Sequence, residues 1–119
     1  MFKYVFLIIG YGSIGKNHAN ILSKMYGNKS VNILTKKNVK TFQTIKNLSE
    51  TKKIKFDYVI ISSPPSIHLK QLKYFEKNFK NKKILVEKPL FNKNSNFKIK
   101  KNQVFVGYNL RFHPIVNYL

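Results

Sequence analysis

A glycine pattern near the start of the chain constrains its fold more than any other feature. The apolar run 5–9 leads directly into Gly10, Tyr11, Gly12, Ser13, Ile14 and Gly15, and a helix-compatible segment follows. A G-x-G-x-x-G pattern between a buried strand and a helix predicts dinucleotide binding. Its glycines permit a tight turn, backbone approach to a pyrophosphate and close helix packing. The pyrophosphate would lie at the helix N-terminus, where N–H groups favour an anion. A purely structural turn is the alternative.

Composition limits the chain to one globular domain. It has 119 residues, of which 43% are hydrophobic and 14% aromatic, enough to bury about two-thirds of the unfolded surface. No apolar run approaches the roughly twenty residues of a membrane span, and the first one is too short for a signal peptide. The absence of cysteine excludes disulfides and fits a cytoplasmic protein.

The formal net charge of +19 raises nucleic-acid binding as another function. Every basic residue except Arg111 is a lysine, however, and the lysines are dispersed along the chain. Reading of base edges favours arginine. We therefore expect a highly charged solvated surface, with nucleic-acid binding as a less favoured alternative.

Strand and helix patterns alternate along the chain. Helices are predicted at 13–25 and from Ser66, an N-cap candidate, to Phe79. Strands are predicted at 5–9, 31–35, 57–63, 83–87 and 103–108, with a short strand at 40–45, a short helix at 47–53 and a loop or single turn within 91–102. This alternation indicates an α/β fold with a doubly wound parallel sheet of the Rossmann type.

The chain's distinctive residues fall at the predicted carboxyl ends of strands. Ligands of doubly wound sheets bind at that edge, near the switch in strand order. Besides the glycine pattern, these strand-end residues are Thr35, Lys36, Ser63, Pro64, Glu87, Lys88 and Asn109. Their convergence strengthens the prediction of a dinucleotide site. No cluster has metal-ligand spacing.

Four motifs occur in order: G-Y-G-S-I-G-K-N-H, S-S-P-P-S-I-H, V-E-K-P-L and V-G-Y-N-L-R-F-H-P. Together they resemble the N-terminal domain of the glucose-fructose oxidoreductase, inositol dehydrogenase and MocA family. The resemblance covers nearly the whole chain and about the first third of a usual member. It implies hydride transfer between NAD or NADP and a sugar or sugar-derivative alcohol. We expect residues 1–110 to form the dinucleotide-binding domain and 111–119 to begin a linker to a missing C-terminal domain, through which members form homo-oligomers.

The resemblance also implies roles for individual residues. Lys88 matches the lysine beside the nicotinamide and the reacting carbon, where an ammonium polarises a hydroxyl. Glu87 would orient this lysine or line the cofactor site. His68 and Asn109 would border the cofactor. The alternatives are a surface position for Lys88 and a strand-end ion pair for Glu87. For His68 the alternative is a capping or packing role, and for Asn109 it is an interdomain hinge contact.

The sequence departs from the dinucleotide pattern at the end of its second strand. An acidic residue is expected there to bind the ribose of NAD, but the chain has Thr35, Lys36 and Lys37, and its first acidic residue is Glu50. Threonine and lysine could instead bind a 2′-phosphate, so the sequence leans towards NADP. As a second departure, we expect the C-terminal domain of the family to be missing. A truncated remnant that binds a dinucleotide without turnover is therefore the main alternative function.

Overall fold

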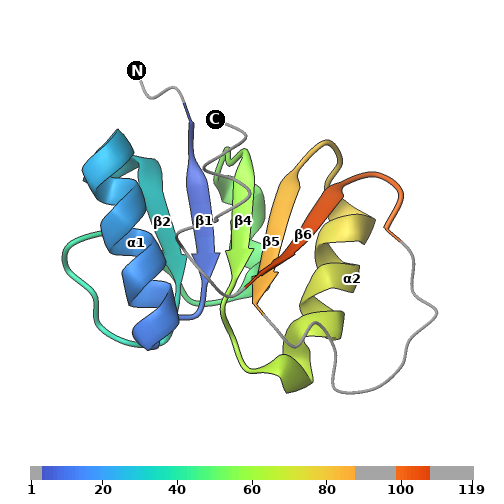
Figure 1. The fold of residues 1–119 in the computed structure, drawn as a ribbon, viewed down its shortest axis with the longest axis horizontal. Helices are drawn as coiled ribbons and strands as arrows, with labels where there is room; N and C mark the ends of the chain where they lie inside the picture. The colour runs from blue at the N-terminus through green and yellow to red at the C-terminus, as the bar shows by residue number, and fades with distance from the viewer. Residues whose placement is uncertain (1–3, 88–98, 108–119) are drawn as a thin grey trace.

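A single sheet of six parallel strands forms the centre of the molecule (Figure 1). The computed structural model describes residues 4–87 and 99–107. The strand order is β3-β2-β1-β4-β5-β6, the order of a doubly wound Rossmann sheet. The strands are β1 (Phe6–Ile9), β2 (Val31–Leu34), β3 (Gln43–Ile45), β4 (Tyr58–Ile61), β5 (Lys83–Glu87) and β6 (Gln103–Gly107). The chain winds outward in one direction from β1 to β3 and in the other from β4 to β6, so the switch point lies between β1 and β4.

Within residues 4–87 and 99–107, two α-helices and three 3₁₀ turns connect the strands. They are α1 (Ser13–Tyr26), η1 (Asn28–Ser30), η2 (Leu48–Lys53), η3 (Pro65–Ile67) and α2 (His68–Asn78). The predicted N-cap at Ser66 is wrong, because this residue lies inside η3 and α2 begins at His68. The double proline before it favours a tight turn first. The predicted strand at 40–45 is correct only for its last three residues.

The sheet is buried on both faces. In β1, Phe6 and Ile8 join a core cluster with Ala19 and Leu22 of α1. The intervening residues, Leu7 and Ile9, join a second cluster with Leu72 and Phe75 of α2. Successive side chains of a strand point to opposite faces, so α1 and α2 cover opposite sides of the sheet. Each fully buried large side chain stabilises the fold by about 1.5–3 kcal/mol.

One carboxylate attaches α2 to the start of β6. Glu76, which is 9% exposed, accepts hydrogen bonds from the backbone N–H groups of Lys100 and Lys101, each at 3.0 Å, and from the Asn102 amide at 3.0 Å. Asn102 in turn accepts a bond from the N–H of Lys82 at 2.8 Å. This network fixes the edge strand to the rest of the sheet.

Candidate dinucleotide site

The glycine pattern forms a turn that only glycine can make at two positions. Gly10 has a φ of 98°, a conformation that residues with a side chain rarely adopt, and its N–H donates to the carbonyl of Leu34 at 2.9 Å. A Cβ on Gly15 would lie 2.3 Å from the Gly10 carbonyl oxygen. The chain therefore turns from β1 into α1 with the helix pressed against the turn, as the sequence predicts.

The middle glycine, Gly12, differs from the other two because open space, and not packed atoms, lies next to it. Gly12 is the N-cap of α1 and has an ordinary φ of −81°. A Cβ built on it meets no atom within 4 Å. No side chain caps α1, and its first turn holds no acidic residue. Since the first N–H groups of a helix have no partner within the helix, this end of α1 presents hydrogen-bond donors and a positive dipole to an open space.

A hollow of about 380 Å³ lies above this helix end, at the switch point of the sheet. It brings the glycine turn together with the segment that follows β4. Its lining residues are Gly10, Tyr11, Gly12, Ser13, Ile14, Ser62, Ser63 and Pro64. None of these described lining residues carries a carboxylate. All of these residues except Ser62 were candidates from the sequence.

Ser62 is a lining residue that the sequence prediction missed. Its backbone N–H donates to the carbonyl of Ile9 at 2.9 Å, and its hydroxyl donates to the same carbonyl at 3.0 Å. The residue thus joins the ends of β1 and β4 below the turn. Its position directly after an apolar strand, as the first serine of S-S-P-P, is the signal that could have identified it.

His68 supports the segment after β4 from beneath. It is completely buried, and its Nε2 lies 2.6 Å from the carbonyl oxygen of Ser63. A carbonyl only accepts, so Nε2 carries the proton and donates. The Ser63 hydroxyl donates to Gln71 Oε1 at 2.5 Å. His68 therefore holds the wall of the hollow in place without lining it.

At the end of β2, a lysine contacts the glycine turn. Lys37 Nζ donates to the carbonyl of Tyr11 at 3.1 Å. Thr35 is only 6% exposed, and its hydroxyl oxygen accepts a bond from the N–H of Lys37 at 3.1 Å. Lys36 is exposed. The Lys37 side chain thus bonds to a residue that lines the hollow, whereas Thr35 bonds within the turn that carries Lys37.

Three candidates cannot be placed in full. Lys88 and Asn109 lie outside the described residues, and of Glu87 only the backbone, at the end of β5, is described. Within 4–87 and 99–107, no group of three or more His, Cys, Asp or Glu side chains could hold a metal ion. No helix in that part of the chain is long and apolar enough to cross a membrane.

A parallel sheet of this order, with a glycine turn and an open helix end at its switch point, defines a dinucleotide-binding domain of the Rossmann class. The chain belongs to the GFO_IDH_MocA family: the family model described as "Oxidoreductase family, NAD-binding Rossmann fold" matches residues 4–102. The resemblance inferred from the sequence is therefore confirmed.

Solved structures share the fold at low sequence identity. The myo-inositol 2-dehydrogenase from Lactobacillus plantarum aligns with a TM-score of 0.62 and 22% identity over 76% of this chain and 29% of its own. The scyllo-inositol dehydrogenase from Lactobacillus casei aligns with a TM-score of 0.59 and 20% identity over 76% and 30%. The chain thus spans about three tenths of the length of these structures. No curated protein sequence matches it.

Proposed function

We propose that this chain binds the pyrophosphate of a nicotinamide dinucleotide in the hollow between α1 and the end of β4. The observation that carries the proposal is the open space around Gly12 at an uncapped helix end. A Cβ built on Gly12 meets no described atom within 4 Å, which leaves room for the pyrophosphate at this place. The backbone N–H groups of Ser13 and Ile14, at the start of α1, would donate to the phosphate oxygens.

We further propose a preference for NADP over NAD. Lys37 already lies beside the glycine turn through its bond to Tyr11, and an ammonium has three N–H donors, so two remain for a phosphate. Lys36 is exposed next to it. A carboxylate at this position would repel a 2′-phosphate, whereas two lysines attract one. Thr35 would keep the turn in the conformation that presents both.

The proposal for the substrate and the catalytic residue rests on family membership. We propose hydride transfer between the cofactor's nicotinamide and a sugar or sugar-derivative alcohol, with Lys88 as the catalytic residue. Its ammonium would donate to the substrate oxygen and take part in moving the hydroxyl proton. Glu87 would orient Lys88, and Asn109 would border the nicotinamide. His68 would act indirectly, by holding Ser63.

The variant Gly12→Asp tests the binding site. Aspartate is a favourable N-cap, so its side chain would bond to the same N–H groups and repel the pyrophosphate. We expect wild-type chain to bind NADPH and NADH saturably in calorimetric titrations, NADPH at least tenfold more tightly. We expect about 100-fold weaker binding by Gly12→Asp, with no loss of stability in denaturant unfolding. Unchanged affinity in this variant would contradict the site.

Lys88→Met tests the catalytic role separately. Because Lys88 is proposed to act on the substrate, the variant should bind NADPH within about threefold of the wild type and lose turnover with sugar alcohols. A variant that retained the wild-type rate would remove Lys88 from the mechanism while leaving the cofactor site intact.

A further inference from the structure

A second hollow lies at the opposite edge of the sheet, where the strands begin. Its volume is about 590 Å³, larger than that of the hollow above the glycine turn. Val5 precedes β1, Asn32 pairs with Gln43 across β2 and β3, and residues 53–55 lead towards β4. Its lining residues are Val5, Asn28, Lys29, Asn32, Lys40, Thr41, Phe42, Gln43, Lys53, Ile54 and Lys55. We call it the amino-edge hollow.

Among the described residues that line the amino-edge hollow, every charged side chain is a lysine. Four lysines line it, and none of these described lining residues is acidic. Of the acidic residues closest in sequence, Glu50 accepts the N–H of Asn47 at 3.1 Å, and Asp57 accepts the N–H of the lining residue Val5 at 2.9 Å. The potentials of four ammonium groups add over the hollow, so an anion of two or more charges would be attracted to it.

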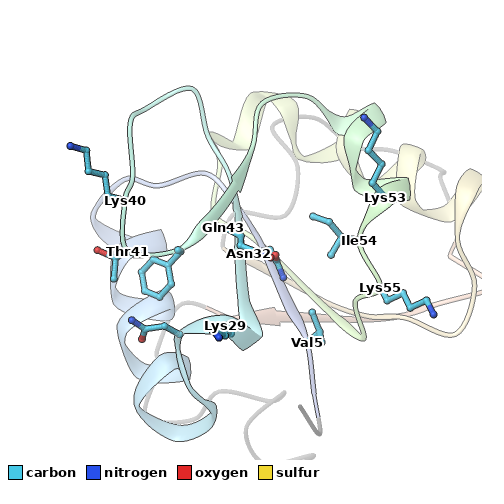
Figure 2. A pocket seen from close by; sticks show the side chains of 11 residues that line it. Val5, Lys29, Asn32, Lys40, Thr41, Gln43, Lys53, Ile54 and Lys55 are labelled. Atoms are coloured by element: carbon cyan, nitrogen blue, oxygen red, sulfur yellow. The ribbon is translucent and has the colours of Figure 1, made fainter. Parts of the chain in front are cut away.

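The lysines of the amino-edge hollow lie on both sides of the apolar residue Ile54. Figure 2 shows Lys40 on one side, Lys53 and Lys55 on the other, and Ile54 between them. All four lysines are exposed, and their flexible stems let the ammonium groups approach a ligand from the rim. Asn32 is 3% exposed and contributes an amide to the lining. Apolar and amide groups on the wall suit an organic moiety rather than a bare anion.

We propose that the amino-edge hollow binds a small phosphorylated organic molecule that carries at least two phosphate charges. The organic part would contact Val5 and Ile54, and the phosphates would bond to lysines on the rim. The volume lies within the range of about 300–1,000 Å³ that small-molecule sites occupy. This proposal is independent of the dinucleotide site, which lies at the other edge of the same sheet.

Amide chemical-shift mapping with ADP and with pyrophosphate tests the proposal. ADP carries an organic moiety and pyrophosphate does not, while both present a diphosphate. At about 0.15 M salt, where distant charges are screened, ADP should shift the amides of residues 41–43 and 53–55. A dissociation constant read from residues 41–43 should be at least tenfold lower for ADP than for pyrophosphate. Any separate response of residues 10–15 reports the glycine turn.

Two double variants with equal charge changes locate the site. Lys53→Gln/Lys55→Gln removes two rim charges, and Lys70→Gln/Lys77→Gln removes two exposed charges from α2. All four changes are at exposed side chains, so both variants should unfold at the wild-type temperature. ADP affinity at residues 41–43 should fall at least tenfold in the first variant and less than twofold in the second.

Three results would overturn the proposal. Equal losses in the two double variants would mean that only the overall charge attracts ADP. Equal affinities for ADP and pyrophosphate would remove the organic moiety from the recognition. Binding of single-stranded DNA at residues 41–43 more than 100-fold tighter than ADP would make the hollow part of a nucleic-acid surface.

Discussion

The carboxyl edge and the amino edge of this sheet differ in the groups that form them. The carboxyl edge, from Gly10 to Gly15 with Ser62 to Pro64, consists of closely packed backbone in which one added carbon atom would lie 2.3 Å from a carbonyl oxygen. The amino edge, around the amino-edge hollow, consists of long exposed side chains on a lining of amides and apolar groups. The carboxyl edge requires residues without a side chain at particular positions, whereas the amino edge is rich in exposed lysines.

This difference determines how each edge responds to substitution. At the glycine turn, effects should be large and specific to one position, because backbone atoms cannot move independently. Around the amino-edge hollow, single changes should have small effects, because exposed charges are solvated and each contributes little. The double variant of Lys53 and Lys55 described above tests the amino edge, and the variants below follow from the largest expected effect to the smallest.

Gly15→Ala should cause the largest loss of stability. Its Cβ would collide with the Gly10 carbonyl, so the turn or α1 must shift, at a cost of about 3 kcal/mol or more. The matched control is Gly12→Ser, whose Cβ meets no atom within 4 Å and should change the free energy of unfolding by less than about 0.5 kcal/mol. Urea unfolding measures both. Equal stabilities for the two variants would contradict the close packing at Gly15.

Glu76→Gln should have the next largest effect. The glutamine has one acceptor oxygen in place of two and directs an NH₂ group at backbone donors, so bonds from residues 100–102 are lost. One of these bonds is buried and two are part-buried, and leaving buried donors unsatisfied costs about 1–3 kcal/mol. The measurement is again urea unfolding, with Glu50→Gln as control, because the bonds that Glu50 accepts from the N–H groups of Lys46 and Asn47 are exposed. A larger loss in Glu50→Gln would contradict the role of Glu76.

The same carboxylate predicts acid sensitivity. Burial raises the pKa of Glu76, but the N–H groups of Lys101 and Lys100, the Asn102 amide and the Lys101 ammonium together hold it below its ordinary value. The unfolded chain therefore binds this proton more tightly, so Glu76 stabilises the fold at neutral pH, and that contribution is lost as pH falls through the folded-state pKa. The stability difference between wild type and Glu76→Gln should shrink on acidification. A stability difference that is constant with pH would contradict this contribution of the Glu76 carboxylate.

Lys37→Gln should cause the smallest change in free energy of these variants. The change should appear in cofactor affinity and should differ between NADPH and NADH. Loss of one charge-assisted bond to a 2′-phosphate corresponds to about tenfold weaker NADPH binding. NADH has no 2′-phosphate, so its affinity should change less than threefold. Lys16→Gln is the control, since Lys16 lies over the Tyr11 ring at 5.6 Å rather than at the end of β2. Equal losses for NADPH and NADH would remove Lys37 from cofactor selection.

The sequence predicted the fold and the glycine turn because both depend on local patterns. The continuous apolar run of β1, the helix spacing after Ser13 and the three glycines each depend on residues close together in the chain. The start of α2 was misplaced, because Ser66 is a favourable N-cap residue but the double proline imposes a 3₁₀ turn first.

Contacts between distant segments could not be predicted in the same way. The bond from Lys37 to Tyr11 joins residues 26 positions apart, and Ser62 reaches Ile9 across 53 positions. Nothing in a lysine-rich sequence distinguishes Lys37 from its neighbours until the sheet brings β2 beside the turn. The amino-edge hollow is likewise assembled from four separate segments, so no single motif encodes it.

The most direct test of the account is a map of amide chemical shifts on addition of NADPH to the wild-type chain. If the N–H groups at the start of α1 bind the pyrophosphate, the largest shifts should fall on residues 12–15, with smaller ones at residues 36–37. An unchanged spectrum at millimolar NADPH and NADH, or shifts confined to residues 41–43 and 53–55, would contradict the dinucleotide site.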